Sequence, residues 1–163
     1  MQFLEKNLED IIFETDNSLL YERGLFIMGR KKRQVRLGNY GISDLITVSI
    51  KQLPHRERYL HFTVYELKQD LVNINTFLQG IGYCKGLKSY LDKNKAYDLY
   101  TISLVLIGKN LDTGSNFSFL PDLIKCDEFS PDGISLSIYT YTYEFDGIQF
   151  KEHEGYTLTN EGF

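Results

Sequence analysis

The chain has 163 residues, of which 42% are hydrophobic and 25% are charged, and its formal net charge is −4. This size and composition predict one soluble globular domain with a substantial core and exclude a disordered chain. The acidic balance argues against a protein that coats nucleic acid along its whole surface, but it is compatible with a local basic site. No run reaches the roughly 18 apolar residues that a membrane span requires.

The two cysteines, Cys84 and Cys126, lie far apart and follow no metal-binding or redox spacing. Reduced thiols in a cytoplasmic protein are therefore expected. The chain has no glycine-rich phosphate-binding motif of the P-loop type. Nothing in it resembles the arrangements that activate a nucleophilic serine or cysteine.

The N-terminal segment, residues 3–13, has the hydrophobic period of an amphipathic helix. Its apolar stripe consists of Leu4, Leu8, Ile11 and Ile12. Glu5 lies at the flank of this stripe, and a solvated acidic helix face is the simplest interpretation of it. The sequence Asp16-Asn17-Ser18 then breaks the helical pattern, and residues 25–28 predict a short strand.

A strongly basic run follows, with five cations in seven positions and no acid among them. The cations are Arg30, Lys31, Lys32, Arg33 and Arg36. In an acidic protein this asymmetry suggests a basic hairpin or loop that contacts phosphates. A solubilising turn is an equally good interpretation of the run.

Two strands are predicted next, over residues 42–50 and 59–68. The turn signal of residues 38–41 precedes the first of them. Because side chains alternate across a strand, Asp44 shares a face with the apolar residues of the first strand. In the second strand, Glu66 and Lys68 share a face with Phe62 and Val64. A buried charge is costly unless it is paired or bound to a metal, so this stripe is unusual for a core.

The two strands are antiparallel neighbours if residues 51–58 form a hairpin connection. The start of the first strand then lies beside the end of the second, which brings Asp44 close to Glu66 and Lys68. A surface ion pair across the strands is the alternative interpretation of Glu66 and Lys68.

A second helix is predicted to run to about Tyr90, capped by Asp70 or Asn73. The expected apolar stripe is Leu71, Ile74, Leu78 and Ile81, and the polar residues Asn75, Gln79 and Tyr83 recur on another face. Three glycines, Gly80, Gly82 and Gly86, weaken this helix by about 1 kcal/mol each relative to alanine. They indicate either the close approach of another backbone or a helix that breaks early.

The C-terminal half predicts more strands. Residues 99–107 are apolar on both faces, as in a central buried strand. A polar loop over residues 109–116 follows, and residues 120–129 are ambiguous. Residues 134–145 alternate cleanly, Asp146-Gly147 signals a two-residue turn, and a return strand begins at Ile148. The tail from Gly155 is polar and is expected to fray.

The predicted strand over residues 134–145 carries a row of tyrosines on one face. The row consists of Tyr139, Tyr141 and Tyr143. Such a row can stack nucleobases or bind a protein partner. Packing within the sheet is the more common use of tyrosine, and it is the preferred interpretation here.

The predicted order is helix, strand, strand, strand, helix, strand, which is an α/β (α+β) architecture with a C-terminal β-hairpin. Together with an acid at the start of one strand and Glu66-Leu67-Lys68 at the end of the next, it resembles the core of the PD-(D/E)XK, or restriction-endonuclease-like, nuclease superfamily. Gln79 and Tyr83, spaced Gln-x-x-x-Tyr, resemble the additional motif of its RecB-type exonuclease branch. The resemblance covers residues 3–107. The proline of the signature is absent, since Ser43 precedes the acid.

The resemblance implies a role for each of these residues. Asp44 and Glu66 would bind Mg²⁺ or Mn²⁺, with the backbone carbonyl of Leu67 as a further ligand, and Glu5 would complete the shell or orient a bound water. Lys68 would offset negative charge that develops on the phosphate, and its pKa should fall beside the cation. Gln79 and Tyr83 would orient this lysine or contact the substrate backbone. The basic run would grip phosphates.

The expected function is therefore metal-dependent hydrolysis of nucleic acid, with DNA as the favoured substrate and a homodimer as one arrangement the resemblance allows. The first alternative is a catalytically silent protein of this fold that acts as a nucleic-acid-binding or protein-interaction scaffold. The second is an interaction module built on the tyrosine hairpin. Metal binding by Asp44 and Glu66 would separate the nuclease from the scaffold. The interaction module would keep its partner binding after Glu66→Ala and Lys68→Ala.

Overall fold

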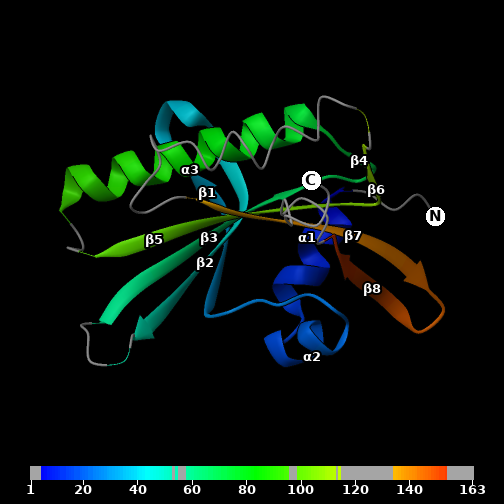
Figure 1. The fold of residues 1–163 in the computed structure, drawn as a ribbon. Coiled ribbons are helices and arrows are strands. Elements are labelled where there is room, and N and C mark those ends of the chain that lie inside the picture. Colours follow the sequence, from blue (N-terminus) through cyan, green and yellow to red (C-terminus); the bar gives the residue numbers. More distant parts are fainter. Residues whose placement is uncertain are drawn as a thin grey trace, which may run out of the picture.

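The computed structural model describes residues 5–52, 54, 58–95, 99–112, 114 and 134–153. They form an α/β protein in which a six-stranded mixed sheet packs against one long helix (Figure 1). The expectations for residues 120–129 and for the tail from Gly155 lie outside the described residues. No helix of the described part is long and apolar enough to cross a membrane.

The helices are α1 (Glu5–Glu14), α2 (Asn17–Glu22) and α3 (Ile74–Asn94), with a short 3₁₀ helix, η1 (Gly38–Tyr40). The large sheet contains β1 (Arg30–Arg36), β2 (Ile42–Gln52), β3 (Arg58–Leu67), β5 (Tyr100–Gly108), β7 (Ser135–Glu144) and β8 (Gly147–Glu152). A second, two-stranded sheet contains β4 (Leu71–Val72) and β6 (Asn110–Leu111).

The strand order of the large sheet is β1-β2-β3-β5-β7-β8. The first three strands are antiparallel neighbours, and β5 pairs with β3 in parallel after the chain has crossed through α3. The β7–β8 hairpin continues the same sheet, because β7 pairs with β5 in parallel. The α/β class is confirmed. The order of helix, three strands, helix and strand is observed with β1 as its first strand instead of residues 25–28, and α2 and the small second sheet are additions. The hairpin loop is Phe145-Asp146, one residue earlier than expected, since Glu144 pairs with Gly147.

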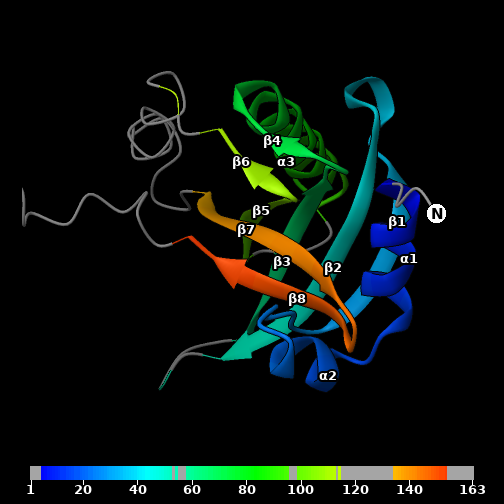
Figure 2. The ribbon, with the colours of Figure 1, turned by 90° about the vertical axis from the view of Figure 1, so that its right-hand side faces the viewer.

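Alternating side chains divide the core into two layers, one on each face of the sheet. On the α3 face, Ile46 and Val64 belong to the same buried cluster as Phe77 and Leu87 of α3. On the other face, Leu45 and Tyr65 pack with residues of α1 and α2, which Figure 2 shows lying away from α3. The odd and even positions of β2 and β3 therefore serve different layers.

Helix α3 begins at a capping box. The side chain of Asn73 accepts hydrogen bonds from the backbone N–H groups of Asn75 and Thr76, at 3.0 and 3.1 Å. The backbone N–H of Asn73 donates to Thr76 Oγ1 at 3.1 Å. This reciprocal pair satisfies orphan donors of the first turn and decides between the two predicted caps in favour of Asn73 over Asp70.

The glycines of α3 allow close approach and do not break the helix. A Cβ atom on Gly80 would lie 2.7 Å from Leu104 Cδ1, and one on Gly86 would lie 2.9 Å from Tyr40 Cβ. A Cβ on Gly82 would meet nothing within 4 Å. Two of the three glycines thus let α3 pack tightly on β5 and η1.

The predicted apolar stripe of α3 is partly wrong. Leu71 lies before the helix in β4, and the side chain of Leu78 is 57% exposed. The face that packs on the sheet carries Thr76, Phe77, Gly80, Tyr83, Cys84, Gly86, Leu87 and Leu91. Small and amphipathic residues make up much of this face, so a search for Leu and Ile spacing alone misplaced it.

Two further expectations are met and two need correction. The basic run forms the edge strand β1, which pairs antiparallel with the next strand, β2, so it is one arm of a hairpin and not a loop. Residues 25–28 belong to no strand. The helical pattern breaks after Glu14, as expected, and a second helix, α2, begins at Asn17. The polar loop after residue 108 contains β6, which pairs with β4 in parallel.

Candidate functional site

Asp44, Glu66 and Lys68 lie together at one end of the β2–β3 ladder, as the sequence predicts. The Oδ2 atom of Asp44 accepts a hydrogen bond from the backbone N–H of Leu67 at 2.9 Å. Lys68 Nζ lies 2.7 Å from Glu66 Oε1. The pairing of Leu45 with Tyr65 sets this arrangement, because it puts the start of β2 beside the end of β3.

Glu66 is buried although it is a carboxylate. Its side chain is 1% exposed, and that of Lys68 is 25% exposed. In the described part of the chain, the second carboxylate oxygen of Glu66, Oε2, is buried and has no hydrogen-bond partner. A buried unsatisfied oxygen is costly, so the interpretation of Glu66 and Lys68 as a surface ion pair does not hold.

The two carboxyl groups have raised pKa values. Burial raises the pKa of Glu66 from 4.5 to about 7, the charge of Asp44 adds to this, and the hydrogen bond from Lys68 opposes it. Burial likewise raises the pKa of Asp44 from 3.8 to about 6, against the hydrogen bond from Leu67. Two carboxyls that resist ionisation side by side are a common feature of functional sites, because stability alone does not favour them.

The ammonium of Lys68 is held between two oxygens. Burial alone would lower its pKa, but the hydrogen bond to Glu66 and the charges of Glu66, Glu5 and Asp44 raise it. Lys68 Nζ also donates to Gln79 Oε1 at 3.3 Å, and Gln79 Nε2 donates to the hydroxyl of Tyr83 at 2.8 Å. The Gln-x-x-x-Tyr pair of α3 therefore does reach the lysine. The lowered pKa that the sequence analysis predicts for Lys68 refers to the site with a bound cation, so it stays a prediction.

Glu5 acts on this cluster through its charge, which contributes to the raised pKa of Asp44 and of Glu66. Among the described residues, no three His, Cys, Asp or Glu side chains are arranged so that they could hold a metal ion. Asp44 and Glu66 are thus the two carboxylates that the structure offers a cation at this site. The roles of Glu5 and of the Leu67 carbonyl as ligands stay predictions.

The basic residues of β1 divide between two tasks. Lys31 Nζ donates to the carbonyl oxygens of Ile12 at 2.8 Å, Phe13 at 3.4 Å and Thr15, at the end of α1. Arg33 forms an ion pair with Asp10 at 2.8 Å and stacks over the ring of Phe13. These two cations therefore attach α1 to the edge of the sheet.

Arg30, Lys32 and Arg36 are exposed. Arg30 pairs with Val48 and Lys32 with Ile46, and directly paired residues share a face. Arg30 and Lys32 therefore project from the α3 face, which is also the face of Asp44 and Glu66. Gln34 interrupts the alternation with a φ of 51°, and its side chain donates to Glu9 at 2.7 Å.

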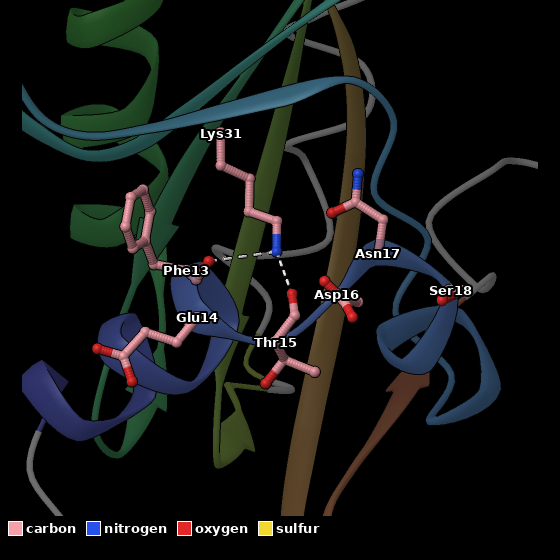
Figure 3. A pocket seen from close by; sticks show the side chains of 7 residues that line it. All are labelled: Phe13, Glu14, Thr15, Asp16, Asn17, Ser18 and Lys31. Carbon is pink, nitrogen blue, oxygen red and sulfur yellow. Dashed lines mark hydrogen bonds between the residues drawn. The ribbon is translucent and has the colours of Figure 1, made fainter.

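An open hollow of about 580 Å³ lies beside the end of α1, and Figure 3 shows its lining. Lys31 reaches into it and is hydrogen-bonded to backbone carbonyls, and burial lowers the pKa of this lysine against the charge of Asp16. None of the lining residues belongs to the cluster of Asp44, Glu66 and Lys68. The polar groups of the hollow serve the end of α1, so its lysine acts as a helix cap.

The tyrosine row serves mainly as packing. Tyr139 and Tyr141 are buried in the core, and Tyr143 is exposed. The hydroxyl of Tyr141 donates to the backbone carbonyl of Gln69 at 2.6 Å, directly after Lys68. Sequence reasoning missed this contact between residues 72 apart in the chain, because it depends on the parallel pairing of β7 with β5.

No family model, curated protein or solved structure matches this chain. The geometry alone indicates what the cluster can do. Two adjacent carboxyls, one of them buried with a free oxygen, suit a hard cation that prefers oxygen ligands. An ammonium at the same place suits a negatively charged oxygen of a substrate.

Proposed function

We propose that this chain is a metal-dependent nuclease that hydrolyses phosphodiester bonds, with DNA as the favoured substrate. The observation that carries the proposal is the environment of the Glu66 carboxylate. This carboxylate is buried at the end of an apolar strand and lies beside both Asp44 and Lys68, and one of its oxygens has no hydrogen-bond partner among the described residues. A fold gains nothing in stability from such a group, so a bound cation is its best physical explanation.

The proposed chemistry assigns each residue one task. Asp44 and Glu66 would hold Mg²⁺ or Mn²⁺, with the Leu67 carbonyl as a third oxygen ligand. A cation bound there would supply an activated water and would polarise the scissile phosphate. Lys68 would donate to a phosphate oxygen and offset the charge that develops there. Gln79, anchored by the hydroxyl of Tyr83, holds the ammonium of Lys68 in place.

The arrangement of the elements supports the finer fold assignment. An antiparallel β1-β2-β3 meander is followed by a helix and a strand parallel to β3. This order is similar to the core of the restriction-endonuclease-like fold, and the acid and the Glu-x-Lys sequence occupy the strand ends that the family motif requires. The β7–β8 hairpin would be an addition at the far edge of this core.

The exposed cations of β1 fit a role in substrate binding. Arg30 and Lys32 project from the same face as the carboxylates, and Arg36 lies at the end of β1 that pairs with the start of β2. Cations on this face would contact the phosphates of a bound strand, and binding would weaken as salt releases the counterions. We assign Lys31 and Arg33 to the attachment of α1 instead.

Cleavage of labelled single-stranded and duplex DNA with EDTA, Mg²⁺ or Mn²⁺ tests the proposal. The wild type should cut only with a divalent cation. Glu66→Gln and Lys68→Met should each reduce the rate at least about 100-fold, because each removes a charge from the reacting centre. Lys88→Met is a matched control, since Lys88 also pairs with a carboxylate but lies away from the cluster.

Cutting that persists in the Lys68→Met protein would show that the activity has another origin. Absence of cutting by the folded wild type on every substrate would favour the catalytically silent scaffold. Binding of nucleic acid by a protein that never cuts would identify that scaffold directly.

A further inference from the structure

On the basis of the proposed function, we infer that the site takes one divalent cation and that the ammonium of Lys68 occupies the place of a second. The groups that already surround Glu66, and the ligands that remain free of them, lead to this number.

One oxygen of Glu66 is already in use. Lys68 Nζ lies 2.7 Å from Glu66 Oε1 and is also bonded to Gln79 Oε1. Gln79 is in turn fixed by the hydroxyl of Tyr83, whose side chain is buried. The ammonium is therefore anchored at this position through a side chain of α3.

The other oxygen of Glu66 is available. Oε2 is buried and has no hydrogen-bond partner among the described residues. One oxygen of Asp44 is likewise engaged, since its Oδ2 accepts a hydrogen bond from the backbone N–H of Leu67 at 2.9 Å. One cation can therefore bind Glu66 and Asp44 on the side away from Lys68.

A second cation would lack ligands. Divalent cations of this kind need about six oxygens each, and two-metal sites lie about 3.5–4 Å apart. The described residues of this cluster provide two carboxylates, and one oxygen of each is already engaged, by Lys68 or by the backbone N–H of Leu67. Two divalent cations beside the ammonium of Lys68 would also bring five positive charges to the two carboxylates, which Coulomb repulsion opposes.

The ammonium thus supplies the second positive charge of the site without a second metal. Lys68 should also weaken the binding of the first cation, because the ammonium and the cation are both positively charged and would both contact the carboxylate of Glu66. Removal of the ammonium should therefore tighten binding of that cation and open Oε1 to a further one.

Titration with Mn²⁺ alone, followed by electron paramagnetic resonance of the free ion at pH 8, tests this inference without any substrate. The wild type should bind one equivalent of Mn²⁺. Lys68→Met should bind it about tenfold more tightly, or bind a second equivalent, while Lys88→Met should match the wild type.

Gln79→Ala is a milder second variant, since it keeps every charge and leaves the ammonium less firmly held. Its affinity for Mn²⁺ should lie between those of the wild type and Lys68→Met. Two equivalents bound by the wild type, or a Lys68→Met protein that binds one equivalent no more tightly than the wild type, would overturn the inference and leave the proposed function intact. No binding by the wild type would overturn both.

Discussion

Helix α3 contacts one lysine–carboxylate pair near its start and carries another near its end, and the carboxyl pKa values of the two pairs shift in opposite directions. Near its start, Gln79 and Tyr83 meet the pair of Glu66 and Lys68. Near its end, Lys88 lies 3.1 Å from Asp92, and both bond to the hydroxyl of Tyr100. The side chains of Lys88 and Asp92 are 58% and 53% exposed, whereas that of Glu66 is 1% exposed.

Burial decides the difference between the two pairs. The pKa of Asp92 is lowered, first by the hydrogen bond from Tyr100 and then by Lys88, so this carboxylate prefers to be ionised. The pKa of Glu66 is raised by burial in spite of its lysine. An ion pair whose role is only structural is expected to resemble the exposed pair of Lys88 and Asp92. Burial of Glu66 and Lys68 costs desolvation energy that the stability of the fold does not require, and a functional role explains it.

The largest expected difference between the two ends comes from removing each lysine. Lys68→Met should lower the free energy of unfolding at pH 8 by about 2–3 kcal/mol, because it leaves a buried carboxylate without its partner. Lys88→Met should lower it by less than about 0.5 kcal/mol, as is usual for an exposed pair on a helix. Urea unfolding of both variants measures this. Equal losses would show that burial does not separate the two pairs.

Removing the carboxylate of the buried pair should change the free energy of unfolding in the opposite direction from removing its lysine. Glu66 has a higher pKa in the folded protein than in the unfolded chain, so the folded state binds more protons between about pH 4.5 and 7. Stability therefore falls as the pH rises through this window. Glu66→Gln should raise the free energy of unfolding at pH 8 by about 1–3 kcal/mol, because the ammonium left behind is partly exposed.

Unfolding curves at pH 5 and pH 8 provide the check on Glu66→Gln. The variant should gain little at pH 5, where Glu66 is protonated in the wild type. A gain of the same size at both pH values would mean that the ionised carboxylate is not the source. Asp92→Asn is the matched control, and it should lose stability slightly at pH 8 because the pKa of Asp92 is lowered.

The stretch of α3 between its two ends offers a third comparison. Gly82→Ala should stabilise the protein by about 0.5–1 kcal/mol, because a Cβ there meets nothing and alanine is the better helix former. Gly86→Ala should destabilise it by about 1 kcal/mol, because its Cβ would press on Tyr40. Thermal unfolding compares the two. Stabilisation by both substitutions would show that α3 does not need a glycine against η1.

A similar contrast within β1 gives the smallest expected effect. Lys32→Gln should weaken DNA binding about threefold and leave stability unchanged, since Lys32 is exposed on the face of the carboxylates. Lys31→Gln should lower stability instead, because Lys31 caps α1. Binding curves at two salt concentrations check this, with a smaller salt dependence expected for Lys32→Gln. Unchanged binding would remove β1 from the proposed interface.

The sequence predicts the cluster because the rules involved are local. Alternation puts Glu66 and Lys68 on one face of β3, and a short hairpin brings Asp44 beside them. The contact from Gln79 follows from helical spacing once α3 crosses this face. Three side chains from two adjacent strands and one from the next helix therefore need little tertiary information.

The rest depends on contacts between distant segments. Leu25 and Ile27 are buried and Phe26 and Met28 are exposed, so the alternation is present without a neighbouring strand to pair with. The cations of β1 disfavour a strand in isolation, and the pairing with β2 overrides them. The burial of Glu66, the property on which the proposal depends, follows from how closely α3 and β5 cover β3.

The central claim is that the buried carboxylate of Glu66 and that of Asp44 together hold a catalytic cation. A crystal soaked in Mn²⁺, with data collected at the manganese absorption edge, tests it most directly. The account predicts one anomalous peak in contact with both carboxylates, with Lys68 still beside Glu66, and no peak in a Glu66→Gln crystal. A wild-type map with no peak at these two residues would contradict it.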